Sequence, residues 1–242
     1  MPSISLTNPT NITRLEFTPI SSEKLGGTID VSAFANLQKL VIGDHNLTEV
    51  EGYANNPNIQ HLQLNGNVLS TPLPSLTEMS SLQRIYFNGN EIIGSFPDIT
   101  GLSNLIAINV GNNQMTGTLP SDFGTLGLTR LDRFNVYDNN FSGTLPSFSG
   151  TTVQWVLCNN NNLSDFTGGV PISLYKFEAI NNNLTQTAVD NILQAFVDAN
   201  RQTPTNDMSQ ASINLSGTGN SAPSSQANAI TLASRGWTVT TN

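Results

Sequence analysis

The feature that most constrains this chain is a repeat of about 23 residues that keeps a single phase. In the copy that begins at Leu82, apolar residues occupy positions 1, 4, 6 and 11, and position 9 is Asn90. Copies begin at residues 12, 37, 59, 82, 105, 131, 153 and 174, so consecutive starts are 21 to 26 residues apart. The first copy, with Ile12, Leu15 and Phe17, is degraded. A repeat of this length predicts a solenoid, because one unit cannot bury its apolar face without its neighbours.

These copies share the pattern L-x-x-L-x-L-x-x-N-x-L, which resembles the leucine-rich repeat. Three copies add a second motif at the same place, which resembles the G-x-[LF]-P half of the plant-like subtype: Gly94-Ser-Phe96-Pro97, Gly117-Thr-Leu119-Pro120 and Gly143-Thr-Leu145-Pro146. The resemblance implies an α/β solenoid, a right-handed leucine-rich-repeat fold with a parallel β-sheet on the concave face and a helical C-terminal cap. We expect one continuous domain with an N-terminal cap at 1–11, eight repeats at 12–186 and a helix-strand cap at 187–242.

Position 9 of the repeat has a structural explanation. Positions 4 and 6 alternate on a short strand and point into the core. Where the chain leaves the strand, backbone groups lose their sheet partners, and a buried amide that both donates and accepts can replace them. The sequence therefore predicts an asparagine ladder, in which His45 takes the place of asparagine in the second copy, made of Asn67, Asn90, Asn113, Asn139, Asn161 and Asn182.

The pattern changes after Leu184. Thr187-Ala-Val-Asp190 resembles a capping box, and the apolar spacing that follows predicts a helix over about 187–200. Ile213-Asn-Leu215 predicts a strand that closes the sheet, and a second helix is expected over about 224–234, ended by Gly236. The N-L-S-G and R-G-W-T-V-T-x-N segments of this tail resemble a C-terminal module of bacterial and bacteriophage leucine-rich-repeat proteins.

Basic and aromatic residues gather at positions predicted to point outward from the concave face. Position 3 alone holds five of the nine basic residues, and three of the four tyrosines fall on the same face. Long polar side chains could simply coat a solvated sheet, but exposed aromatics beside amides favour a binding surface. The predicted ligand-binding residues are Arg14, Lys39, His61, Arg84, Tyr86, Arg133, Tyr137, Trp155, Tyr175 and Lys176.

Composition excludes several classes of protein. The net charge is −8 with only 11% charged residues, whereas a nucleic-acid binder needs a basic surplus. No apolar run approaches the roughly 20 residues of a membrane-spanning helix. The start, MPSISLTNPT, lacks the features of a secretory signal peptide. We therefore expect no nucleic-acid partner and no membrane insertion.

No catalytic or metal site is predicted, and no cofactor is expected. Cys158, the only cysteine, takes a core position and is expected to be a buried, inert thiol. His45 and His61 lie in different columns and do not converge on a third ligand. The carboxylates of Asp132, Asp138 and Glu178 are scattered over an open sheet with no pocket to raise a pKa, so the chain is expected not to be an enzyme.

Three hypotheses for the function remain. The first is a non-enzymatic recognition or adhesion module of a bacterial or bacteriophage surface, which binds a glycan or a protein through its concave face. The second is a structural component, a decoration or spacer of a virion or surface appendage that assembles with other virion or surface proteins. A receptor ectodomain or inhibitor like those of the plant subtype is a third hypothesis. The expected location is a virion, the extracellular space or a cell surface.

Overall fold

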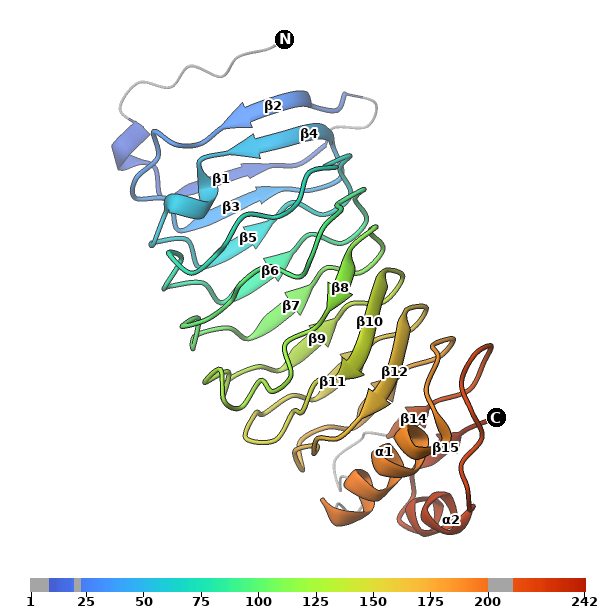
Figure 1. The fold of residues 1–242 in the computed structure, drawn as a ribbon. Helices are drawn as coiled ribbons and strands as arrows, with labels where there is room; N and C mark the ends of the chain where they lie inside the picture. Colours follow the sequence, from blue (N-terminus) through green and yellow to red (C-terminus); the bar gives the residue numbers. More distant parts are fainter. Residues whose placement is uncertain (1–8, 20–22, 200–210) are drawn as a thin grey trace.

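The structure, a computed structural model, describes residues 9–19, 23–199 and 211–242 and shows an elongated solenoid (Figure 1). Each coil contributes one short strand to a ten-stranded sheet in which all neighbouring strands are parallel. In sheet order these strands are β1 Arg14–Phe17, β3 Lys39–Ile42, β5 His61–Gln63, β6 Arg84–Tyr86, β7 Ala107–Asn109, β9 Arg133–Asn135, β11 Trp155–Leu157, β13 Lys176–Glu178, β14 Ser212–Asn214 and β15 Thr238–Thr240. The predicted solenoid with a parallel sheet and a helical C-terminal segment is confirmed.

Shorter elements complete the other side of the coils (Figure 1). The strands β8 Thr116–Thr118, β10 Asn140–Leu145 and β12 Asn162–Phe166 form a three-stranded parallel sheet, and β2 Gly26–Asp30 pairs with β4 Asn46–Glu51. Two short 3-10 helices lie at Pro9–Asn11 and Tyr53–Asn55. The G-x-L-P motifs start within the three-stranded sheet, where Gly117 and Gly143 adopt φ of 82° and 80°. Glycine suits these positions because a Cβ disfavours the left-handed region.

The core fills the space between the two sides. At positions 1, 4, 6 and 11 of the copies from residue 37 onward, the apolar side chains are buried. Phenylalanine side chains pack together in the middle of the core. The centre of the Phe123 ring lies 4.8 Å from that of Phe134 and 5.5 Å from that of Phe148. Burying each such side chain contributes about 1.5–3 kcal/mol relative to leaving it in water. The degraded first copy is only partly buried, as expected for the outermost coil.

The position-9 asparagines tie successive coils together inside the turns. Asn139 Nδ2 donates to the carbonyl oxygens of Val110 (2.9 Å) and Val136 (3.2 Å), and Asn139 Oδ1 accepts from Met115 N at 2.9 Å. The same three bonds recur at Asn67, Asn90, Asn113, Asn161 and Asn182. Each side chain therefore satisfies backbone groups of two coils that the sheets leave unpaired.

The C-terminal helices differ in detail from the sequence prediction. Helix α1 spans Gln186–Asp198, and its N-cap is Thr185, whose Oγ1 accepts from Ala188 N at 3.1 Å. The helix predicted from about residue 187 is present and begins one residue earlier, whereas the capping box of Thr187 and Asp190 is wrong: the Asp190 carboxylate instead accepts from Ser224 N at 2.9 Å. Helix α2 spans Ala227–Ser234, so it begins three residues later than predicted. Residue 200, the expected end of the first helix, lies outside the described residues.

The asparagine ladder continues into this C-terminal segment. Asn220 Oδ1 accepts from the backbone N of Asn182 and Leu184, and its Nδ2 donates to Ala179 and Leu215. Asn242 then donates to the carbonyl oxygens of Gly217 and Asn220. Strands β14 and β15 are thus two more coils of the same solenoid. The prediction that the strand near Ile213 closes the sheet is therefore wrong, because β15, which was not predicted from the sequence, pairs with its outer edge.

Candidate functional site

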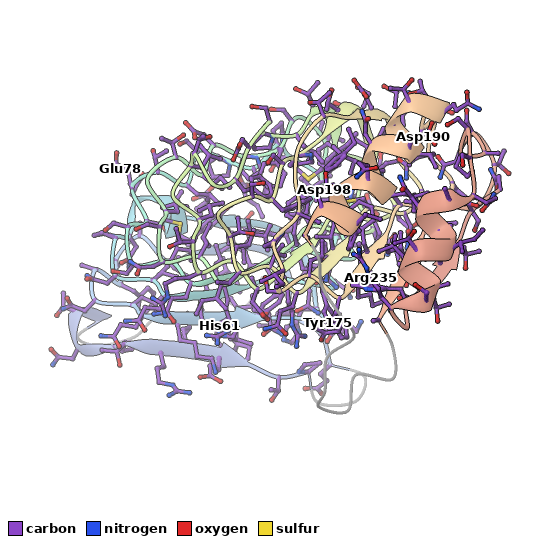
Figure 2. The ribbon with its side chains drawn as sticks, turned by 90° about the horizontal axis from the view of Figure 1, so that it is seen from below. His61, Glu78, Tyr175, Asp190, Asp198 and Arg235 are labelled. Atoms are coloured by element: carbon purple, nitrogen blue, oxygen red, sulfur yellow. The ribbon has the colours of Figure 1, made fainter. Side chains whose placement is uncertain are left out.

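Sheet register brings the predicted position-3 residues into one row. The Cα partners run Arg14, Lys39, His61, Arg84, Ala107, Arg133, Trp155 and Lys176, one from each successive strand. Tyr86 ends β6, Tyr137 follows β9, and Tyr175 immediately precedes β13. In Figure 2, His61 and Tyr175 lie along the same side of the molecule, whereas Glu78 lies on the opposite side. The predicted residues therefore share one elongated surface, the concave face.

At the N-terminal end of this face, two cations share one carboxylate. Glu16 lies 2.8 Å from Arg14 and 3.1 Å from Lys39. Hydrogen bonds from Arg14 and Lys39 hold the pKa of Glu16 below its usual range. This group is exposed, so the ion pairs order the side chains more than they stabilise the fold.

His61 and Tyr86 form the next cluster. Their rings are 5.6 Å apart, and His61 Nε2 lies 3.2 Å from Gln63 Oε1. Burial lowers the pKa of His61, and the charges of Lys39 and Arg84 lower it further, while the hydrogen bond to Gln63 and the charge of Glu16 act in the opposite direction. His61 is therefore mainly neutral at pH 7, and the positive charge here comes from the neighbouring cations.

Trp155 organises the C-terminal half of the face. Arg133 Cζ lies 4.9 Å and Lys176 Nζ lies 5.4 Å from the centre of its rings. Arg133 belongs to β9 and Lys176 to β13, the two strands that flank β11 in the sheet. The Tyr175 ring meets Trp155 edge-on at 6.1 Å. Each cation also has a carboxylate: Asp132 lies 3.3 Å from Arg133, and Glu178 lies 3.1 Å from Lys176.

Tyr137 depends on a glycine in the preceding coil. A Cβ added to Gly111 would lie 2.5 Å from the Tyr137 ring, so the ring packs directly over this backbone. Gly111 has an ordinary φ, and its role is therefore space for the ring rather than backbone freedom.

A row of exposed amides along the edge of the sheet was missed by the sequence reasoning. Asn160 Nδ2 donates to Asp138 Oδ1, Asn181 Nδ2 donates to Asn160 Oδ1 at 2.8 Å, and Asn181 Oδ1 accepts from Thr218 N at 2.9 Å. Asp138, Asn160 and Asn181 all adopt positive φ, near 52–54°. The signal available in the sequence was the recurrence of Asp or Asn at position 8, since these residues tolerate the left-handed region.

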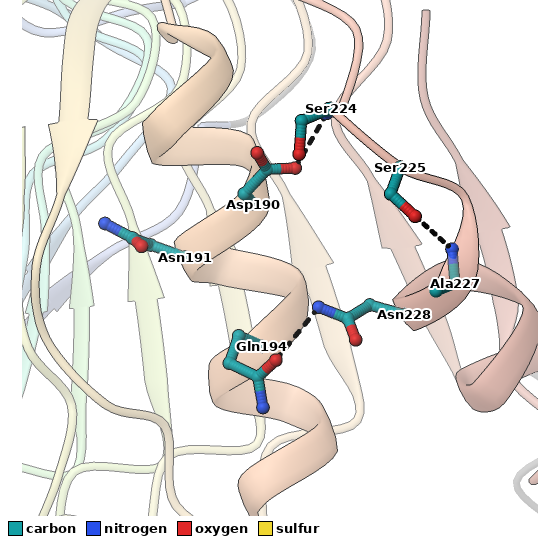
Figure 3. A pocket seen from close by; sticks show the side chains of 7 residues that line it. All are labelled: Asp190, Asn191, Gln194, Ser224, Ser225, Ala227 and Asn228. Carbon is teal, nitrogen blue, oxygen red and sulfur yellow. Dashed lines mark hydrogen bonds between the residues drawn. The ribbon is translucent and has the colours of Figure 1, made fainter.

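A polar pocket between α1 and α2 offers a second candidate site (Figure 3). Its polar groups largely bond to one another: Asp190 accepts from Ser224 N, and Gln194 Oε1 accepts from Asn228 Nδ2 at 3.1 Å. Ser225 Oγ accepts from Ala227 N at the start of α2. The Gln194–Asn228 bond joins the two helices and the Asp190–Ser224 bond ties α1 to the segment before α2, so these polar groups serve the packing of the C-terminal segment.

Cys158 is fully buried, and burial raises the pKa of its thiol. Within residues 9–19, 23–199 and 211–242, no cluster of three or more His, Cys, Asp or Glu side chains could hold a metal ion. None of the helices described in these ranges is long and apolar enough to span a membrane.

Comparison with known proteins supports the fold. The family model "Leucine Rich Repeat" matches residues 104–126. No curated protein sequence matches the chain. A solved TDR receptor is similar with a TM-score of 0.60 and 23% identity, over 70% of this chain and 31% of that one.

Two further solved structures are similar over most of this chain. The leucine-rich-repeat ectodomain of the plant membrane receptor kinase GASSHO1/SCHENGEN3 from Arabidopsis thaliana, in complex with CASPARIAN STRIP INTEGRITY FACTOR 2, gives a TM-score of 0.59 at 22% identity, over 75% of this chain and 26% of that one. The functional domain of InlJ from Listeria monocytogenes gives a TM-score of 0.59 at 22% identity, over 78% of this chain and 39% of that one. This chain thus spans less than two fifths of each of these three structures. It contains a leucine-rich repeat and has the leucine-rich-repeat fold.

Proposed function

We propose that this protein is a non-enzymatic recognition module that binds a protein or a glycan through its concave face. The observation that carries the proposal is the register-aligned row of cations and aromatic side chains between Arg14 and Lys176. Such a surface combines charge with large, rigid aromatic groups, which are enriched in binding surfaces. The GASSHO1/SCHENGEN3 structure, whose ectodomain holds a bound partner, supports this use of the fold.

The proposed setting is the surface of a bacterium or a bacteriophage virion. It rests on the resemblance of the C-terminal segment to modules of bacterial and bacteriophage leucine-rich-repeat proteins. The similarity to InlJ from Listeria monocytogenes is compatible with a bacterial source. In this setting the module would act in adhesion or receptor binding.

The test is the double variant Trp155→Ala/Arg84→Ala, compared with wild type in glycan-array, protein-array and bacterial cell-binding assays. Arg130→Ala is the matched control, since Arg130 lies outside the ten-stranded sheet and, within the described residues, its side chain donates a hydrogen bond to Asn104 alone. Loss of binding in the double variant alone supports recognition by the concave face. Binding that is unchanged in the double variant would place recognition elsewhere on the molecule.

The alternative is a structural role as a decoration or spacer of a virion or appendage. The continuous ten-stranded sheet and the ladder, which join each coil to the next by hydrogen bonds, favour it. Stable co-purification with capsid or tail proteins that persists in the double variant would support this role over recognition by the concave face.

A further inference from the structure

The cations of the concave face differ in whether they already have an anionic partner. Arg14 and Lys39 share Glu16, Arg133 pairs with Asp132, and Lys176 pairs with Glu178. Within the part of the chain that the structure describes, Arg84 makes neither an ion pair nor a side-chain hydrogen bond. Arg84 is therefore the cation on this face that has no anionic partner among the described residues, and all of its guanidinium donors are open to a ligand.

The neighbours of Arg84 in the sheet add a second arginine. Register places Ala107 between Arg84 and Arg133, so the two backbones are about 10 Å apart at roughly 4.8 Å per strand. Ala107 is 4% exposed and puts no long side chain between the two arginines. We call Arg84, Ala107 and Arg133 the arginine notch.

Arg133 is held in place for this purpose. Its guanidinium stacks on Trp155 at 4.9 Å, and its only hydrogen bond within the described residues runs from Nε to Asp132, at 3.3 Å. The two Nη groups therefore keep their donors for a ligand. A guanidinium fixed by an aromatic ring loses less freedom on binding than a mobile lysine would.

We infer that the arginine notch binds a carboxylate from an extended acidic segment of a protein partner, which crosses the strands of the concave face. This inference rests on the proposed function and names its ligand. Guanidinium groups suit carboxylates because they form paired, charge-assisted hydrogen bonds. Elsewhere the protein repels such a segment, since its net charge is −8.

The same geometry disfavours a neutral glycan. Sugars bind aromatic side chains by stacking on an open ring face, but Arg133 Cζ and Lys176 Nζ already lie over the Trp155 rings, 4.9 Å and 5.4 Å from their centre. An acidic glycan could supply the anion without stacking, and the experiment below separates it from a peptide.

The inference is tested by fluorescence anisotropy with the full chain at low salt. The probe is a short fluorescein-labelled peptide in which glutamate alternates with serine, and its partner peptide has glutamine in place of glutamate. We expect the glutamine peptide to bind wild type about tenfold more weakly, and Arg84→Gln to weaken the glutamate peptide about as much. Arg130→Gln, which removes an arginine outside the notch, should leave binding unchanged.

Ala107 allows a second, sharper test. In Ala107→Glu the new carboxylate would occupy the notch from within and abolish binding of the glutamate peptide. Ala107→Gln adds the same bulk without charge and should keep binding within about threefold. Circular dichroism of both variants shows whether the fold is retained, and Arg84→Gln provides the test if either variant unfolds.

Each outcome has a distinct meaning. Equal binding of the glutamate and glutamine peptides would overturn the carboxylate inference while leaving recognition by the concave face intact. Binding of heparin, sensitive to Arg84→Gln, without binding of either peptide would replace the protein segment with an acidic glycan. Absence of binding by all three probes would overturn the notch as an anion site, whereas the array experiment above tests the face itself.

Discussion

Two columns of the repeat run the length of the same sheet and obey different rules. Position 9 is asparagine in six copies and His45 in another, whereas position 3 holds Arg, Lys, His, Ala and Trp. The position-9 side chain must satisfy backbone groups of two coils, such as Val110 O and Met115 N for Asn139. The position-3 side chains point outward from the sheet, and none of them is required to satisfy backbone groups of two coils. Backbone requirements thus restrict the ladder, while the outer column remains available for recognition.

The largest expected effect comes from breaking the ladder at its centre. Asn139→Ala leaves buried backbone groups without partners, each costing about 1–3 kcal/mol, so we expect a loss of about 3 kcal/mol in the free energy of unfolding. Asn140→Ala, at the exposed neighbouring position, is the matched control and should change it by less than about 0.5 kcal/mol. Urea denaturation measures both, and similar losses in the two variants would contradict the ladder's role.

The next prediction asks whether the C-terminal segment obeys the ladder rule. Asn220 repeats the ladder bonds to Leu184 N and to the carbonyl oxygen of Ala179, and it also accepts from Asn182 N. We expect Asn220→Ala to cost about 2 kcal/mol, because fewer coils lie beyond it. Asn228→Ala, which removes one bond between α1 and α2, should cost less than about 1 kcal/mol. The reverse order, measured by urea denaturation, would mean that helix contacts rather than the ladder hold the C-terminal coils.

A smaller effect on stability, of opposite sign, is expected at the ladder position that holds His45 instead of asparagine. His45 Nδ1 accepts from Leu25 N at 3.1 Å, but its buried Nε2 has no hydrogen-bond partner among the described residues. His45→Asn would replace this unpaired ring nitrogen with an amide group that can donate to the backbone, and it should raise the free energy of unfolding by about 1 kcal/mol. A lower melting temperature in this variant would show that the imidazole packs in a way that asparagine cannot.

The outer column should contribute little to stability. We expect Arg84→Gln to change the free energy of unfolding by less than about 0.5 kcal/mol, because Arg84 makes no ion pair within the described residues. Thermal melts of Arg84→Gln beside those of Asn139→Ala compare the two columns directly. A loss approaching that of Asn139→Ala would mean that this column is also structural.

The smallest effect is a pH dependence at His61. Burial lowers its pKa in the folded chain from the usual 6.5, so the unfolded chain binds more protons at weakly acidic pH. Stability from this group is complete above pH 6.5 and is lost as pH falls through the lowered pKa. His61→Gln should therefore lose less in melting temperature than wild type between pH 7 and pH 5. Parallel losses would assign the pH dependence to other groups.

The sequence predicted the alignment of successive coils well, because the fixed phase of the repeat places equivalent positions beside each other on neighbouring strands. The row from Arg14 to Lys176 follows directly from that phase. Prediction was weaker in the C-terminal segment. Asn220 lies 38 residues after Asn182, with α1 inserted between them, so the period of the repeat does not identify it as a member of the ladder. Thr185 and Thr187 are equally good caps in sequence, and only packing of α1 decides between them.

The sequence by itself determined the solenoid, its buried columns and which residues share the concave face, because burial and backbone pairing repeat with the period of the chain. Only the tertiary structure decided how those residues pair. Glu16 lies between two cations, Arg133 stacks on Trp155, and Arg84 has no ion-pair partner among the residues that the structure describes. The contacts of Glu16 with Lys39 and of Arg133 with Trp155 join residues that are more than twenty positions apart in the sequence. They depend on the direction that each long side chain takes across the sheet. A repeat pattern determines the position of a residue along its strand and the face of the sheet on which it lies. The surrounding side chains then determine which contacts it makes.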